Sequence, residues 1–187
     1  MYNYILFLGI LTVIWVVNGR MIIKSAKENI TGEVYNHTGL GIFFTLMTLE
    51  LILGKTGMWT QANILYLQII GYILYIPSIF LVFGAIIQLK HIGKAKSLAP
   101  HGANNLVQIG IYGIIRHPMW LGMVIWSVAL VFIFQSVLSI ILSSIAIVCF
   151  GIGSIKEDEF NLKEFGDPYR EYMKKVPMWN FLNGLRK

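Results

Sequence analysis

The chain has 187 residues, of which 56% are hydrophobic and only 13% are charged. Its mean hydropathy of +0.67 excludes a disordered chain, and its single cysteine, Cys149, excludes a disulfide scaffold. So much apolar surface exceeds what one small core buries, which disfavours a soluble enzyme. The composition therefore indicates a single-domain polytopic membrane protein with a basic charge balance of +6.

Three apolar segments in the first half of the chain are long enough to be membrane spans, which need about 20 residues. The first, residues 2–17, has no preceding positive charge and no cleavage site, so it is not predicted to be a signal peptide. The second covers residues 40–54. The third covers residues 64–89 and contains Pro77, which predicts a kink.

Two further spans are predicted at residues 118–134 and 137–155. The fourth span opens with Pro118, a residue suited to the first turn of a helix. Only Gln135 and Ser136 separate the two segments, so they are predicted to form a tight antiparallel hairpin. The expected fold is an all-α bundle of five membrane-spanning helices.

The positions of Lys and Arg support this five-span arrangement. Alternating sides of the membrane would carry 14 basic residues against one, Lys55. Because positive charge prefers the cytoplasmic side, the N-terminus is predicted outside and the C-terminus in the cytoplasm. This sidedness accounts for the basic balance, so no nucleic-acid partner is expected. The polar stretches 90–115 and 156–187 then share the cytoplasmic side, where chemistry is expected.

The sequence Arg116-His117-Pro118 places a cation, an imidazole and a helix start at one membrane boundary. The first turn of a helix offers unpaired N–H groups to an anion, and Arg116 can clamp a carboxylate through two hydrogen bonds. The alternative is that Arg116 only anchors the span by extending to lipid headgroups.

Three consecutive acidic residues, Glu157, Asp158 and Glu159, follow the fifth span. Successive helical residues diverge by about 100°, so the three cannot share one face. At least one is expected to point into the bundle, to bind a cation or ammonium group or to pair with Arg116; the alternative is a solvated face. Beyond them, apolar residues at a spacing of three or four predict an amphipathic tail helix with a break at residues 166–168. These apolar residues are Leu162, Phe165, Tyr169, Tyr172 and Val176.

From about Phe83 to Val176 the chain resembles the isoprenylcysteine carboxyl methyltransferase and phospholipid methyltransferase superfamily. The shared motifs are Leu-Val-x-x-Gly-x-Tyr at 106–112, Arg-His-Pro-x-aromatic-x-Gly at 116–122, and an acidic pair shortly before the Phe-Gly at 165–166. Members are small integral-membrane enzymes that use S-adenosylmethionine. We expect one membrane domain over 1–187, with N-terminal spans at 1–82 and a cofactor-binding catalytic core at 83–187.

The resemblance implies a set of residues that bind S-adenosylmethionine and its product S-adenosylhomocysteine: Asn104, Asn105, Leu106, Val107, Tyr112, His117, Pro118, Met119, Trp120 and Glu157. Physical reasoning adds Asp158, because an acidic side chain can receive the cofactor's ammonium group, while aromatic rings face its sulfonium cation. The expected catalytic residues are Arg116, His117 and Glu157. His117 is a candidate base, needed only where the acceptor must first lose a proton.

The methyl acceptor is expected to be hydrophobic, lipid-like or prenylated, and to enter from the bilayer between helices. Its accepting atom stays open among oxygen, nitrogen and sulfur. Two positions depart from the resembled pattern: Asn104 stands where the family often has His, and Gly153 where isoprenylcysteine enzymes have a substrate-side Arg. The second departure weighs against the carboxylate of a prenylated protein as acceptor.

Two other classes of function are alternatives to methyl transfer. One is an NADPH-dependent membrane reductase of the sterol-reductase type, which resembles the same region but has more spans. The other is a small transporter or assembly factor, for which intramembrane polar residues or half-chain symmetry would be expected.

No metal site is predicted, because His37 and His91 lack partners at ligand spacing. Glu50 is expected to extend to water from the outer end of its span, and residues 151–153 to form a helix-packing surface.

Overall fold

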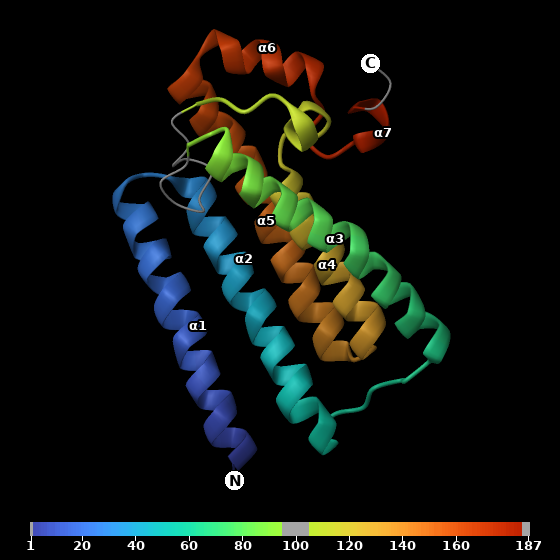
Figure 1. The fold of residues 1–187 in the computed structure, drawn as a ribbon. Helices are drawn as coiled ribbons and strands as arrows, with labels where there is room; N and C mark the ends of the chain where they lie inside the picture. The colour runs from blue at the N-terminus through green and yellow to red at the C-terminus, as the bar shows by residue number, and fades with distance from the viewer. Residues whose placement is uncertain (1, 95–104, 185–187) are drawn as a thin grey trace.

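The computed structural model describes residues 2–94 and 105–184 (Figure 1). Within these ranges the chain is helical, without a β-strand. Four helices are long and apolar enough to cross a membrane, at Tyr4–Lys27, Thr31–Thr56, Leu65–His91 and Val137–Phe165. A fifth apolar helix, α4 (Pro118–Phe134), has 17 residues.

The long helices pack in the order α1, α2, α5, α4, α3, so that α5 and α4 form the centre of the bundle. Their bounds are α1 Tyr2–Lys27, α2 Thr31–Thr48, α3 Leu65–His91 and α5 Val137–Phe165. The C-terminal ends of α1, α3 and α5 lie at the same end of the bundle as the start of α4 (Figure 1). We call this end of the bundle the polar end. Three short helices lie there: η4 (Gly110–Gly113), α6 (Asp167–Lys175) and α7 (Phe181–Gly184).

Three helices extend further toward the polar end than the apolar segments predicted. The first continues past residue 17 to Lys27, the second begins at Thr31, and the fifth runs past residue 155 to Phe165. The polar residues at these ends do not stop the helices, because the bundle gives them partners. Asn18 donates to the Ile14 carbonyl at 2.9 Å and also contacts the ring of His37 at 3.1 Å.

The predicted hairpin between the last two apolar helices is confirmed. Gln135 takes a left-handed conformation (φ 50°) and ends α4, while Ser136 caps α5 through a reciprocal pair of hydrogen bonds with Ser139. The Gln135 side chain also binds both backbone groups of Ile64, at 2.8 and 2.9 Å. The turn is therefore tied to the start of α3, which continues without interruption through Pro77.

Glu50 does not extend to water as expected; its residue is 1% exposed. A short π-helix, η1 (Leu49–Leu53), carries it at the end of α2. Its carboxylate accepts hydrogen bonds from Trp59 (2.9 Å) and Gln61 (2.8 Å), and from the hydroxyl of Ser136. The segment after α2 folds back over the side chain, so burial is compensated by three donors rather than avoided.

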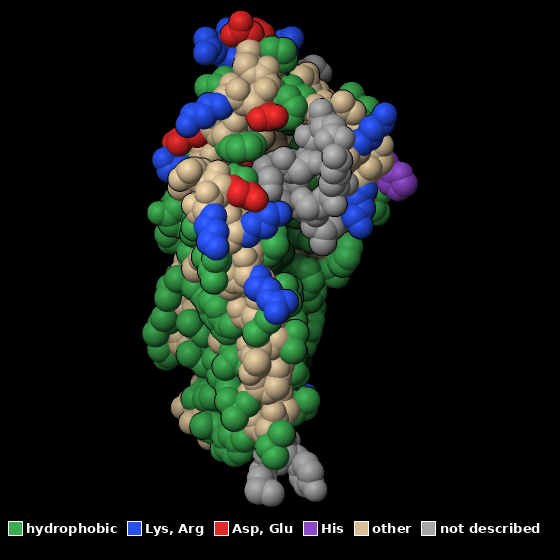
Figure 2. Space-filling model, turned by 90° about the vertical axis from the view of Figure 1, so that its left-hand side faces the viewer, with side chains coloured by type: hydrophobic (Ala, Val, Ile, Leu, Met, Phe, Trp, Pro, Cys, Tyr) green, Lys and Arg blue, Asp and Glu red, His purple; other side chains and the backbone are tan. Residues whose placement is uncertain are grey.

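The outer surface of the bundle is apolar over most of its length. Large hydrophobic side chains on α3 are among the most exposed, including Tyr66, Ile76 and Phe80. In Figure 2, hydrophobic side chains cover the long part of the molecule, and most charged side chains lie toward one end. Such a surface suits hydrocarbon rather than water, which agrees with an integral membrane protein.

Candidate functional site

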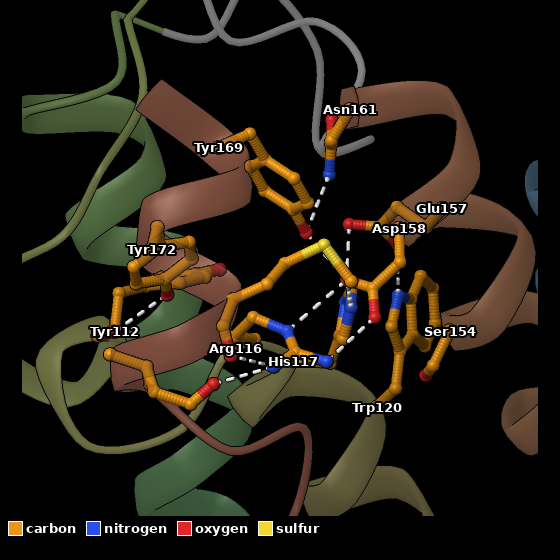
Figure 3. A network of polar contacts seen from close by, with 12 residues as sticks. Tyr112, Arg116, His117, Trp120, Ser154, Glu157, Asp158, Asn161, Tyr169 and Tyr172 are labelled. Carbon is orange, nitrogen blue, oxygen red and sulfur yellow. Dashed lines mark hydrogen bonds and ion pairs between the residues drawn. The ribbon is translucent and has the colours of Figure 1, made fainter. Parts of the chain in front are cut away.

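Asp158 is the centre of a buried polar network at the polar end of the bundle (Figure 3). Its carboxylate accepts from Arg116 Nη2 at 2.8 Å and Nε at 3.3 Å, contacts His117 Nε2 at 2.7 Å, and accepts from the Tyr169 hydroxyl at 2.5 Å. The donors come from the start of α4 and from α6, whereas Asp158 lies near the end of α5. One carboxylate thus joins three separate segments.

The backbone before α4 is positioned by the C-terminal tail. Pro118 occupies the first turn of α4, and His117 is the N-cap. The backbone N–H of Arg116 donates to the Pro177 carbonyl at 3.0 Å, and that of His117 to the Met178 carbonyl at 3.4 Å. Residues 177–178 therefore hold the segment that presents the side chains of Arg116 and His117 to Asp158.

Arg116 holds the end of α6 as well as Asp158. Its Nη1 donates to the carbonyls of Met173 (3.2 Å) and Val176 (2.5 Å). These carbonyls lie in and just after the last turn of α6, where a helix has unpaired acceptors and favours a cation. Four of the five guanidinium N–H groups are thereby used within the protein.

Glu157 points into the bundle beside Asp158, whereas Glu159 does not. Its carboxylate accepts from Trp120 Nε1 at 2.7 Å and lies 3.5 Å from His117 Nδ1. Glu159 is exposed and pairs with Lys156 at 2.8 Å. The expectation that the three acidic residues do not share one face is confirmed, and of the alternatives weighed for them, pairing with Arg116 is realised by Asp158.

His117 is held as a cation. Burial lowers its pKa, but the charge of Glu157 and the hydrogen bonds to Asp158 and Glu157 outweigh this effect and raise the pKa to about 9. The network of Arg116, His117, Glu157 and Asp158 therefore contains two positive and two negative charges at neutral pH. This balance makes burial of four charged groups tolerable.

Two tyrosines of α6 complete the network as neutral donors. Burial, with the charge of Asp158, raises the pKa of Tyr169 far above its ordinary value. Burial also raises the pKa of Tyr172, whose hydroxyl donates to the Tyr112 carbonyl at 2.6 Å. The two rings pack edge to face at 5.6 Å. Tyr172 thus fixes α6 against η4, which carries Tyr112, and Tyr169 fixes α6 to Asp158.

A pocket lies beside this network, and both predicted and unpredicted residues line it. The predicted lining residues are Asn105, Leu106, Val107, Tyr112 and Arg116. The residues that sequence reasoning did not place there are Leu89, Asn161, Phe165, Tyr169 and Tyr172. Asn161 follows Asp158 by three residues and Glu157 by four, so its helical spacing was the available signal. The aromatic residues Phe165, Tyr169 and Tyr172 belong to the predicted amphipathic tail helix, for which the sequence predicted only a packing role.

The other predicted site residues lie around the pocket rather than on its wall. Trp120 and Glu157 bind each other, with Trp120 stacked on Phe150 at 5.8 Å. Pro118 and Met119 are buried where α4 begins. Asn104 lies outside the described residues. Among the described residues, no group of three or more His, Cys, Asp and Glu side chains is arranged to hold a metal ion.

Gly153 on α5 packs closely against α2. A Cβ atom at Gly153 would meet the side-chain carbonyl of Asn36, and one at Gly32 would lie 3.0 Å from the Glu157 backbone nitrogen. The position where the resembled enzymes have an Arg therefore has no room for a side chain while Asn36 occupies it. The expected small-residue packing surface is confirmed at this position.

Comparison with known families decides the assignment that the motifs indicated. The sequence model of the isoprenylcysteine carboxyl methyltransferase family matches residues 69–164, about half of the chain. The chain belongs to this family. The matched region includes most of α3, all of α4, the residues between them and most of α5, and thus Arg116, His117, Glu157 and Asp158. The match thus covers the parts of the network that lie at the start of α4 and in α5, whereas α6, which carries Tyr169, follows the matched residues.

Three curated proteins similar to this chain are each named protein-S-isoprenylcysteine O-methyltransferase. The Xenopus laevis protein is 30% identical over 166 residues, which cover 81% of this chain and 58% of the relative. The Schizosaccharomyces pombe protein is 37% identical over 73 residues (38% and 31% of the two chains), and the Dictyostelium discoideum protein 30% over 119 residues (59% and 49%). The matches thus cover between 31% and 58% of the length of these relatives. No solved structure gives a significant match.

Removing the central carboxylate charge tests the network. We expect Asp158→Asn to destabilise the protein by about 3–5 kcal/mol, because it leaves the buried Arg116 and His117 cations without their main partner. The matched control is Glu159→Gln, which breaks an exposed pair and is expected to cost about 0.5 kcal/mol or less. Unfolding in detergent micelles measures both. Equal, small effects would contradict the central role of Asp158.

The charge of His117 predicts a pH-dependent stability. Because its folded pKa of about 9 exceeds the unfolded value of about 6.5, its stabilisation is full below pH 6.5 and is lost as the pH rises through 9. The change is on the order of 3 kcal/mol. We expect the melting temperature to fall over this range in wild-type protein and to fall less in His117→Gln. A wild-type curve no steeper than that of His117→Gln would show that the imidazole is not held as a cation.

Proposed function

We propose that this protein is a membrane-embedded, S-adenosylmethionine-dependent methyltransferase that acts on the carboxylate of a prenylated, cysteine-type acceptor. The observation that carries the proposal is the pocket of apolar and aromatic side chains beside a buried, charge-balanced network. The names of the curated relatives support an oxygen acceptor on an isoprenylcysteine. The closely packed Gly153 means that recognition of that acceptor cannot use an Arg at this position.

The residues of the pocket fit S-adenosylmethionine, which supplies the methyl group when bound. Tyr112, Phe165 and Tyr172 offer aromatic faces suited to an adenine ring or a sulfonium cation. The carboxylates of Glu157 and Asp158 add negative charge nearby for the ammonium group. Arg116 retains one N–H for the cofactor's carboxylate, so its larger contribution is to hold α6 in place beside the pocket.

The protonation state of His117 favours a carboxylate acceptor. A carboxylate is nucleophilic as it stands, whereas an ammonium acceptor must first give up a proton. His117 is already protonated at neutral pH and donates to acidic partners, so it has no free lone pair to act as a base. The protein then contributes alignment of the reacting groups, which can supply about 7–11 kcal/mol of the barrier reduction.

The proposed arrangement in the membrane has five spans, with α4 as the fourth. The N-terminus lies outside, and the polar end with α6 lies in the cytoplasm. Residues 1–82 form the N-terminal spans and residues 83–187 the catalytic core of one domain. The cofactor enters from the cytoplasm, and the acceptor enters from the bilayer between helices.

Cysteine labelling tests this orientation. In a Cys149→Ala background, we expect Lys55→Cys to react with a membrane-impermeant maleimide from outside the cell, and Lys94→Cys to react only after the membrane is opened. The reason is that the two positions lie at opposite ends of an odd number of spans. Reaction of both positions from the same side would contradict the five-span topology.

Calorimetric titration with S-adenosylhomocysteine tests the cofactor site. We expect Glu157→Ala to weaken binding about tenfold or more, as loss of one charge-assisted interaction implies. Glu159→Ala, the exposed control, is expected to stay within about twofold of wild type. If folded wild-type protein binds neither S-adenosylmethionine nor S-adenosylhomocysteine, the methyltransferase proposal fails. Binding of NADPH in their place would favour a reductase.

A further inference from the structure

Asn161, near the end of α5, has a buried amide that is only partly used within the protein. The residue is 8% exposed and lines the pocket beside the polar network. Within the described ranges, its side chain forms one hydrogen bond, from Nδ2 to the Tyr169 hydroxyl at 3.4 Å, and its Oδ1 atom accepts none. Oδ1 is not sealed inside the protein, in contrast to unpartnered buried atoms such as Ser143 Oγ. A buried residue of the pocket wall therefore keeps an accessible acceptor.

The polar network fixes which way this amide points. The Tyr169 hydroxyl donates its proton to the Asp158 carboxylate at 2.5 Å, so its oxygen can only accept from Asn161 (Figure 3). Because an amide orientation follows from its hydrogen-bond network, Nδ2 rather than Oδ1 must face Tyr169. One N–H of Nδ2 is then used, and the second lies on the same edge as Oδ1. Asn161 thus presents a donor and an acceptor side by side.

A donor beside an acceptor matches one part of S-adenosylmethionine in particular. The edge of an adenine ring carries an amino group that donates next to a ring nitrogen that accepts, and an Asn side chain forms two parallel hydrogen bonds with such an edge. The ends of the amino-acid part match less well, because an ammonium group only donates and a carboxylate only accepts. The amide edge of Asn161 is therefore complementary to the base.

Apolar side chains of the pocket suit the faces of the same base. Phe165 and Leu106 line the pocket and pack against the buried cluster that contains Tyr169. Phe165 follows Asn161 by four residues on one face of α5, and its ring stacks on that of Tyr169 with 6.5 Å between the ring centres. Stacking holds every base in a similar way, so the identity of the base has to be read at its edge.

We propose that Asn161 recognises the adenine of the cofactor through two hydrogen bonds, to its amino group and to the adjacent ring nitrogen. This inference rests on the proposed function and assigns the residue that selects the base of S-adenosylmethionine. Asn161 follows Glu157 by four residues, so both lie on one face of α5, about 6 Å apart along its axis. Glu157 then serves the ammonium end of the cofactor, and Asn161 serves the base, closer to the end of α5.

Two ligands that differ at this edge test the proposal: S-adenosylhomocysteine and S-inosylhomocysteine, in which an oxygen replaces the amino group of the base. In calorimetric titrations of the full-length protein in detergent micelles, we expect wild type to bind the first about tenfold or more tightly than the second. The reason is that the inosine oxygen places an acceptor against Oδ1. Rotation of the amide to suit this oxygen would break its hydrogen bond to Tyr169.

Substitution of Asn161 should remove this preference. We expect Asn161→Ala and the volume-conserving Asn161→Leu to reduce it to about twofold, by weakening the binding of S-adenosylhomocysteine without weakening that of S-inosylhomocysteine. The matched control is Glu164→Gln, an exposed position on the same helix, which should preserve the wild-type preference.

Each outcome separates this proposal from the proposed function. Binding of neither ligand by folded wild-type protein would defeat the methyltransferase proposal itself. Equal binding of both ligands by wild type would overturn the reading of the base and leave the cofactor site intact. An unchanged preference in the Asn161 variants would assign the reading to another residue. An equal loss of both ligands, or failure of both variants to fold, would show a contact to the ribose or a structural role, and would also overturn the proposal.

Discussion

The rest of the site depends on the ion pair between Arg116 and Asp158. It joins the loop before α4 to the end of α5, and the same guanidinium holds the last turn of α6. Tyr169 and Tyr172, which form part of the pocket wall, are carried by α6. A buried ion pair stabilises only when its remaining hydrogen bonds are satisfied, and here Asp158 also receives His117 and Tyr169. The pocket exists because one carboxylate satisfies all these donors.

The charge balance of this network sets what chemistry it can perform. Two cations and two carboxylates cancel at close range, so the network can lie next to an apolar bundle without a large desolvation cost. The same balance fixes His117 in its protonated form and removes it as a base. Under the proposed function, such a site supports a transfer that needs alignment rather than proton removal, which agrees with the O-methyltransferase names of the curated relatives.

Local signals in the sequence predicted the parts of the structure that depend on local rules. Residues 118–134 formed the expected helix because a proline starts it and a left-handed Gln135 ends it. Of the three consecutive acidic residues, Glu157 and Asp158 are buried and Glu159 is exposed, as expected for helical residues that diverge by about 100°. The burial of Glu50 was not predictable in this way, because its donors include Ser136, which lies 86 residues away in the sequence. The pocket role of Tyr169 and Tyr172 likewise depends on the direction in which the chain turns at Gly166, whose φ is +61°.

The shortness of α4 has a consequence for where the reaction takes place. Its 17 residues rise about 25 Å, whereas the hydrocarbon layer of a bilayer is about 30 Å thick. With α4 spanning the membrane as proposed, the helix is about 5 Å shorter than the hydrocarbon layer, and local thinning of the bilayer or polar residues that extend from its ends make up the difference. In the proposed arrangement, the network at the start of α4 lies at the boundary of the hydrocarbon layer. For the prenylated acceptor proposed above, a site at this depth lets the prenyl chain stay in the hydrocarbon while the polar end is modified.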